Sequence, residues 1–182
     1  MEKYIRIASY IIAALVGISV VSSVTWAKFG ELRVRQSAEP FEFTSLRERE
    51  RQLKCMADNI YYEAAMEPAE GKIAVAQIVM NRVAHPSFPK DPCAVIYQRT
   101  VFHKNVVCQF TWLCDGSVNR RPIRQDLYAE SQRAAKMVLM EGFRLPSLND
   151  ALFYHADYVN PRWNKVRVTT IGRHIFYRPR EA

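Results

Sequence analysis

Apolar residues recur at helical spacing in three segments of the chain. The first segment covers residues 46–65, and its apolar positions fall on one stripe of a helix: Leu53, Ala57, Ile60 and Ala64. Thr44 or Ser45 can cap the start of this helix, because a side-chain hydroxyl accepts hydrogen bonds from free backbone amides. Pro68 ends or kinks it. We therefore predict an amphipathic helix with a charged outer face.

The second and third segments are also predicted to be helices. Residues 70–85 are largely apolar, and although their β-branched side chains would suit a strand, their length and alanine content favour a buried helix. Residues 123–143 form the third helix, with Gly142 near its C-terminal end. Between these two segments lie a proline-rich turn at 85–93 and a short, irregular stretch at 94–117, which we expect to be a loop region near a functional site.

The end of the chain has the pattern of strands. Residues 151–179 are predicted to be extended. A hairpin is expected around a turn near Gly172, flanked by apolar residues on both sides: Val166 and Val168, then Ile175 and Tyr177. Helices that come first and strands that come last indicate an α+β domain.

An uncharged segment runs from Ile7 to Ala27, with basic residues on both sides. It is long enough to span a bilayer as a helix, which takes roughly 20 residues, and it also fits a cleaved signal peptide. Trp26 lies where an interfacial anchor would, which favours retention. We expect a signal-anchor or signal-peptide segment, a linker and an exported domain, over residues 1–27, 28–45 and 46–182. Export argues against a nucleic acid as partner.

Charge and cysteine content agree with export. The formal net charge of +8 favours an anionic partner such as a membrane surface or an acidic wall polymer. Four cysteines outside the cytosol predict two disulfides, and the sequence leaves their pairing open: Cys55, Cys93, Cys108 and Cys114. Because the chain has no Cys-x-x-Cys pair and no helical His-x-x-x-His, no metal or other cofactor is predicted.

Two glutamates at the end of the first helix are candidates for catalysis. Glu63 is flanked by tyrosines and alanines, and a carboxyl in apolar surroundings keeps its proton near neutral pH because the charged form is disfavoured. It can therefore act as a general acid, although the pattern fits a solvated carboxylate equally well. Glu67 could supply the second carboxylate of a glycosidase pair, but polar residues are ordinary at a helix end.

Two later segments, CQFTWLCDG at 108–116 and FYHADYVNPRW at 153–163, mix aromatic rings with amides and acids. Aromatic faces pack on sugar rings, and amide and acid groups hydrogen-bond sugar hydroxyls. Together with a buried glutamate, these segments indicate a sugar-binding groove. Its candidate lining residues are Tyr62, Glu67, Gln109, His155, Tyr158 and Trp163. Phe110, Phe153 and Trp112 are expected in the core instead.

In this order, the segments resemble a known family. The stretches IYYEA, EGKIAVAQIVMNRV, HPSFP, CQFTW, YHADYV and IGRHIFYR are similar to the SleB-type cell wall hydrolases, over residues 53–178. The resemblance implies a lysozyme-like α+β domain related to lytic transglycosylases, with a helical lobe and a C-terminal β-hairpin region. It also implies that Glu63 is the single catalytic acid, and that Gln109, His155 and Tyr158 position the glycan.

An enzyme of this family would cut peptidoglycan between N-acetylmuramic acid and N-acetylglucosamine. Glu63 would protonate the bridging oxygen, and the 6-hydroxyl of the muramic acid residue would close on the anomeric carbon to give a 1,6-anhydro sugar. Three alternatives stay open: a muramidase-type hydrolase that uses water, an N-acetylmuramoyl-L-alanine amidase, and a membrane-anchored peptidoglycan-binding module without activity.

The N-terminal segment is rich in alanine, serine and glycine, so its hold on lipid would be weak. In this it resembles the signal-anchor-release segments of phage endolysins. The resemblance implies a protein that is anchored in the inner membrane facing the periplasm, or released into the periplasm. A bacterial enzyme that remodels the wall fits the same pattern.

Overall fold

The computed structural model describes residues 38–116, 118 and 122–180. The predicted signal or anchor segment, residues 1–27, lies outside these ranges, so the expected membrane attachment and periplasmic location stay predictions. In the part of the chain that is described, no helix is long and apolar enough to cross a membrane.

Three helices form the core of the domain, as predicted. They are α2 (Leu46–Ala64), α3 (Ala69–Ala84) and α5 (Gln125–Met140), and each packs against the other two. Ser45 caps α2, since its hydroxyl accepts a hydrogen bond of 3.1 Å from the amide of Glu48. α2 ends before Pro68, which then serves as the N-cap of α3.

A fully buried glutamine holds the helices to the chain that follows α5. Gln77, in the middle of α3, donates to the carbonyl of Leu145 at 3.1 Å and accepts from the amide of the same residue at 2.6 Å. This pair of bonds satisfies both backbone groups of Leu145, which would destabilise the fold if they were buried without partners. The short 3-10 helix η3 (Pro146–Leu148) follows directly.

The stretch at 94–117, which the sequence indicated to be irregular, contains a β-hairpin. β1 (Arg99–Phe102) pairs antiparallel with β2 (Asn105–Cys108). The two turn residues, His103 and Lys104, have φ angles of 47° and 69°. Two-residue turns of this kind usually carry asparagine and glycine, so no residue at this turn predicted it. The expectation of an irregular loop was therefore wrong for this part of the stretch.

Both predicted disulfides are present, and the structure settles their pairing. Cys55–Cys93 joins α2 to the short helix α4 (Pro92–Ile96). Cys108–Cys114 closes a small loop that contains the 3-10 helix η1 (Thr111–Leu113).

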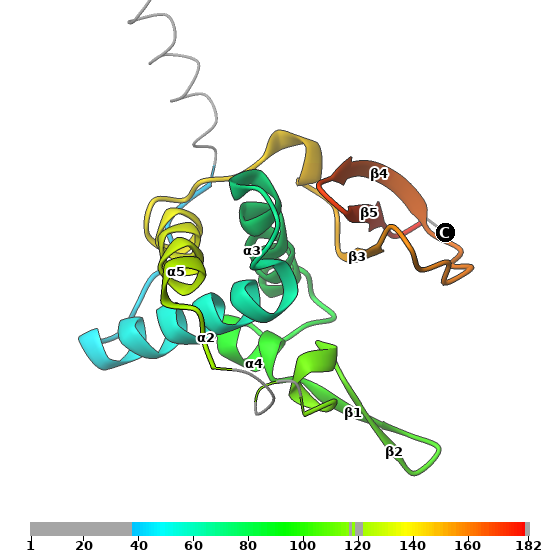
Figure 1. Ribbon diagram of the computed structural model, residues 1–182, viewed down its shortest axis with the longest axis horizontal. Coiled ribbons are helices and arrows are strands. Elements are labelled where there is room, and N and C mark those ends of the chain that lie inside the picture. The colour runs from blue at the N-terminus through cyan, green and yellow to red at the C-terminus, as the bar shows by residue number, and fades with distance from the viewer. Residues whose placement is uncertain (1–37, 117, 119–121, 181–182) are drawn as a thin grey trace, which may run out of the picture. The chain divides into compact units, whose positions relative to one another are not determined.

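The C-terminal region is a three-stranded antiparallel sheet. The predicted hairpin is present as β4 (Val166–Ile171) and β5 (His174–Arg178), with Gly172 at φ +57° in its turn. β3 (Phe153–Ala156) pairs with the other edge of β5, which gives the order β3-β5-β4. Figure 1 shows this sheet beside α3, which contacts β4. The α+β class is therefore confirmed, with one strand more than the hairpin that was expected.

Residues 38–45, the described part of the predicted linker, pack on the domain. Phe41 and Phe43 meet edge to face at 5.2 Å and lie partly buried against the core. The amide of Phe41 also donates to the carbonyl of Leu139 at 2.8 Å. These contacts make this segment part of the folded domain, because its two aromatic rings bury apolar area that a solvated linker would expose.

Candidate active site

A cavity of about 560 Å³ lies between the helices and the C-terminal sheet. Its walls come from the last turns of α2 and α3, the loop after β2, strand β3 with the loop that follows it, and the start of β5. Among the described residues that line it, Glu63 is the only carboxylate. Six of the seven predicted site residues line this cavity: Tyr62, Glu63, Gln109, His155, Tyr158 and Trp163.

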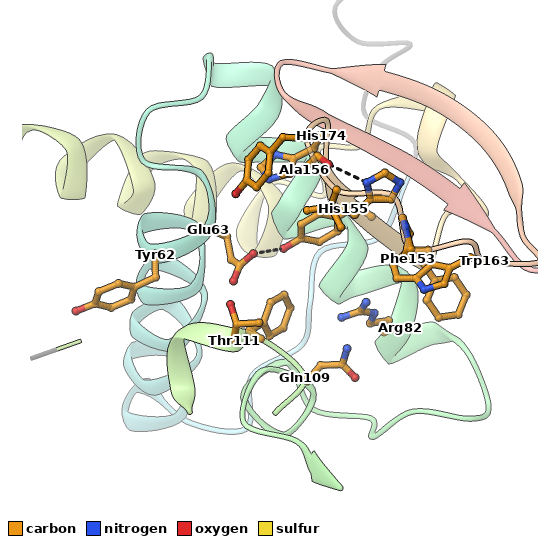
Figure 2. Close-up of a pocket in the computed structure, with 15 residues that line it drawn as sticks. Tyr62, Glu63, Arg82, Gln109, Thr111, Phe153, His155, Ala156, Trp163 and His174 are labelled. Carbon is orange, nitrogen blue, oxygen red and sulfur yellow. Dashed lines mark hydrogen bonds between the residues drawn. The ribbon is translucent and has the colours of Figure 1, made fainter. Parts of the chain in front are cut away.

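The carboxyl group of Glu63 is held from one side. It belongs to the last turn of α2 and is partly buried, and its Oε2 accepts a hydrogen bond of 2.9 Å from the hydroxyl of Tyr154 on β3. Figure 2 shows the other carboxyl oxygen pointing away from Tyr154, towards Thr111 and the open cavity. One oxygen is therefore anchored, and no hydrogen bond within the described part of the chain holds the other.

Burial decides the protonation of this pair. Loss of solvent raises the pKa of Glu63, and this outweighs the hydrogen bond from Tyr154 and the positive charge of Arg82, which both lower it. Burial, together with the nearby charge of Glu63, also raises the pKa of Tyr154 well above its usual value. The tyrosine hydroxyl therefore stays protonated and acts as a donor. Glu63 keeps its proton to a higher pH than a solvated glutamate.

A disulfide-closed loop forms the wall next to Glu63. Between Cys108 and Cys114, the indole of Trp112 donates to Oδ1 of Asn59 in α2 at 3.0 Å. The same indole stacks on Tyr62 with ring centres 4.8 Å apart. Trp112 and Phe110 are buried, as the sequence predicted. These anchors hold Gln109 and Thr111, which flank Phe110, at the cavity.

The opposite wall is aromatic. His155 is fixed through both ring nitrogens, with Nδ1 2.8 Å from the carbonyl of Ala156 and Nε2 2.9 Å from the hydroxyl of Tyr177. Trp163 meets the edge of this histidine ring at 5.5 Å. Phe153, which was expected in the core, lines the cavity beside them because it opens the strand that forms this wall. The result is a rigid aromatic surface.

Glu67 is the predicted site residue that does not line the cavity. Its Oε2 accepts a hydrogen bond of 3.0 Å from the amide of Arg173 in the β4–β5 turn. The carboxylate lies so close to Gly172 that a side chain at that position would collide with it. Glu67 therefore ties the α2–α3 connection to the sheet. It does not form a carboxylate pair with Glu63 in the cavity, because Pro68 directs the chain away after α2 has ended.

Four polar residues of the cavity were not predicted from the sequence: Arg82, Thr111, Tyr154 and His174. Arg82 did carry a signal, because it is a charged residue inside a largely apolar helix. Tyr154 and His174 had none, since a tyrosine and a histidine in short strands are ordinary. No group of three His, Cys, Asp or Glu residues within the described ranges could hold a metal ion.

Replacing Glu63 by glutamine tests its burial without reference to activity. Because burial raises the pKa of Glu63 above 4.5, the native protein is favoured below pH 4.5 and loses stability as rising pH ionises the group. Glu63→Gln has no charge to bury, so its melting temperature should exceed that of the native protein at pH 7 and approach it near pH 4. Glu50→Gln, at an exposed position of the same helix, controls for the loss of a charge. If Glu63→Gln is no more stable than the native protein at pH 7, burial does not raise the pKa of Glu63.

Curated proteins similar to this chain are spore cortex-lytic enzymes. That of Bacillus subtilis is 28% identical over 126 residues, which cover 68% of this chain and 36% of that protein. That of Halalkalibacterium halodurans is 29% identical over 126 residues, which cover 68% of this chain and 34% of that protein. The chain thus matches about a third of the length of these relatives.

Solved structures agree with these relatives. The catalytic domain of the Bacillus cereus SleB protein has a TM-score of 0.53 at 23% identity, over 79% of this chain and 96% of that one, and so shares the fold. The catalytic domain of the germination-specific lytic transglycosylase SleB from Bacillus anthracis has a TM-score of 0.55 at 26% identity, over 77% of this chain and 100% of that one.

A family model completes the comparison. The model for cell wall hydrolases matches residues 66–177, which include the loop after β2 and the C-terminal sheet but begin just after Glu63. The assignment of Glu63 therefore depends on the geometry of the cavity. The match covers more than half of the chain, and the chain belongs to the cell wall hydrolase family.

Proposed function

We propose that this protein degrades peptidoglycan as a lytic transglycosylase, with Glu63 as its general acid and base. The observation that carries the proposal is the partly buried carboxyl of Glu63, which is held by Tyr154 in a cavity lined by aromatic and polar groups. A carboxyl with a raised pKa can donate a proton to a leaving oxygen at the pH where the enzyme works.

The reaction would proceed in two proton transfers. Glu63 gives its proton to the oxygen that joins muramic acid to N-acetylglucosamine, and that bond breaks as positive charge develops at the anomeric carbon. The 6-hydroxyl of the same muramic acid residue then attacks this carbon and returns its proton to the Glu63 carboxylate. The products are a 1,6-anhydro end and a free 4-hydroxyl, and no water is consumed.

The single carboxylate among the described lining residues supports a reaction in which a hydroxyl of the substrate itself attacks the anomeric carbon. Retaining and inverting glycosidases usually place two carboxyl groups on either side of the bond, roughly 5 to 10 Å apart. Among the described residues that line this cavity, Glu63 is the only carboxylate; Asp115, whose charge also raises the pKa of Glu63, does not line it, and Glu67 is bonded to the β4–β5 turn. An acceptor hydroxyl on the substrate needs no second carboxylate. The lytic transglycosylase name of the Bacillus anthracis domain supports the same choice.

The other predicted site residues would bind the glycan. Tyr62 and Trp163 offer aromatic surface, Gln109 offers an amide from the loop after β2, and His155 is held rigidly at the opposite wall. Tyr158 is 79% exposed at the rim. It would meet sugar units farther from the bond that is cut.

Product analysis tests the proposal. The native protein should release glycan fragments from purified peptidoglycan that end in 1,6-anhydromuramic acid, as measured by mass spectrometry. A digest in water enriched in heavy oxygen is the control, since the new ends should carry no solvent oxygen. Reducing ends that contain solvent oxygen would mean a muramidase, and free stem peptides with intact glycan would mean an amidase. Either result would overturn the transglycosylase assignment.

The hydroxyl of Tyr154 should set the upper limb of the pH profile. Its hydrogen bond stabilises the ionised form of Glu63 and so lowers the pKa of this group. In Tyr154→Phe that stabilisation is lost, the pKa rises further, and the fall of kcat/KM at high pH should shift to higher pH. Tyr177→Phe removes a hydroxyl that bonds His155 in the same sheet and should leave this limb in place. A shift to lower pH in Tyr154→Phe would refute the role of the hydroxyl.

A further inference from the structure

Arg82 is a buried cation at the cavity. It lies in the last turn of α3 and is only 4% exposed. Moving a guanidinium group out of water is unfavourable, so buried arginines are normally paired with a carboxylate. Within the described ranges the structure gives Arg82 no ion pair. Another feature must account for its burial.

Burial lowers the pKa of Arg82 and the charge of Glu63 acts on it to raise that pKa, but the contacts that fix the side chain are not ion pairs. Nε donates to the carbonyl of Leu152 at 2.9 Å. The rings of Phe88 and Phe110 each lie 5.5 Å from the central carbon of the guanidinium, at the distance of a cation–π contact. These contacts hold the plane of the guanidinium group.

One nitrogen of the guanidinium group is a donor without an acceptor. NH1 of Arg82 is buried and has no hydrogen-bond partner among the described residues. The side chain lines the same cavity as Glu63 and Tyr154, and Figure 2 shows its guanidinium group pointing into the space across from Glu63. A buried donor that is rigidly held and unpaired requires an explanation, and a ligand oxygen in the cavity provides one.

We propose that the guanidinium group of Arg82 binds an acyl oxygen of the muramic acid residue that is bound beside Glu63. This inference rests on the proposed function. Acyl oxygens are the strong acceptors of a glycan strand, and muramic acid carries two acyl groups: the neutral 2-acetamido group, and the 3-O-lactyl group, which is an amide where a stem peptide is attached and a carboxylate where none is. Since a substrate without the oxygen leaves the buried donor unpaired, Arg82 determines specificity. It binds substrate and does not transfer a proton.

Binding measurements with three ligands test this role and identify the oxygen. Affinities are measured by calorimetry in the full-length Glu63→Gln protein, with and without Arg82→Gln. The ligands are a glycan tetrasaccharide without stem peptides, whose lactyl groups are carboxylates, the same tetrasaccharide after N-deacetylation, and a chitin tetrasaccharide, which has acetamido but no lactyl groups. Arg82→Gln should weaken binding of the intact glycan about tenfold to a hundredfold, the usual effect of losing a hydrogen bond from a charged donor.

The pattern over the ligands separates the two sources. If the acetamido oxygen is bound, the loss also occurs with the chitin tetrasaccharide and disappears with the deacetylated glycan. If the lactyl oxygen is bound, the loss occurs with both muramic acid ligands and disappears with chitin. An equal loss for all three ligands, or no loss for the intact glycan, would overturn the proposal.

Two controls protect the conclusion against a folding defect. Arg144 is also buried, but its NH1 donates to the carbonyls of Val138 and Phe143 at 2.8 Å and it does not line this cavity. Arg144→Gln should therefore change no ligand affinity. If Arg82→Gln does not fold, Arg82→Lys keeps the charge while losing the fixed fork, and the same three-ligand pattern is expected. If the native protein cleaves glycan normally while Arg82→Gln weakens the binding of all three ligands equally, this inference is refuted and the proposed function stays intact.

Discussion

Glu63 lies where an ionised carboxylate is poorly solvated, at the C-terminal end of a helix and against the wall of a cavity. The negative end of the helix dipole disfavours charge there, and burial does so more strongly. The hydroxyl of Tyr154 and the positive charge of Arg82 act in the opposite direction but do not compensate fully. The site thus holds a carboxyl with a raised pKa between two groups that stabilise its ionised form. Such a group can release a proton and later take one back.

This balance depends on how the helices and the sheet are held together. Tyr154 comes from β3 and Glu63 from α2, so their 2.9 Å hydrogen bond requires both parts of the domain in register. Glu67 contributes to that register by binding the amide of Arg173, and the Cys108–Cys114 disulfide closes the loop that forms the neighbouring wall. Glu67 and the two cysteines do not line the cavity, yet they hold parts of its walls in place.

The sequence predicted the helices, the α+β class and the presence of Glu63 in a cavity, because each depends on local spacing or on one charged residue beside apolar neighbours. It did not predict the β1–β2 hairpin, whose turn at His103 and Lys104 lacks the usual residues. It also missed Tyr154, since a tyrosine in a strand becomes informative only when the fold brings it to Glu63. Arg82 could have been found by the argument that singled out Glu63. For Glu67, nothing local distinguishes a carboxylate that binds a distant backbone amide from one that lines a cavity.

The comparison of Glu63→Gln with Glu67→Gln tests the central claim most directly. Both glutamates lie between the last turn of α2 and the start of α3, and glutamine keeps the oxygen through which each accepts its hydrogen bond. The rate of glycan release from purified peptidoglycan should fall about a hundredfold to ten-thousandfold in Glu63→Gln, the range for loss of a general acid. It should stay within a few-fold of the native rate in Glu67→Gln. Near-native activity of Glu63→Gln, or an equal loss in a fully folded Glu67→Gln protein, would contradict the account.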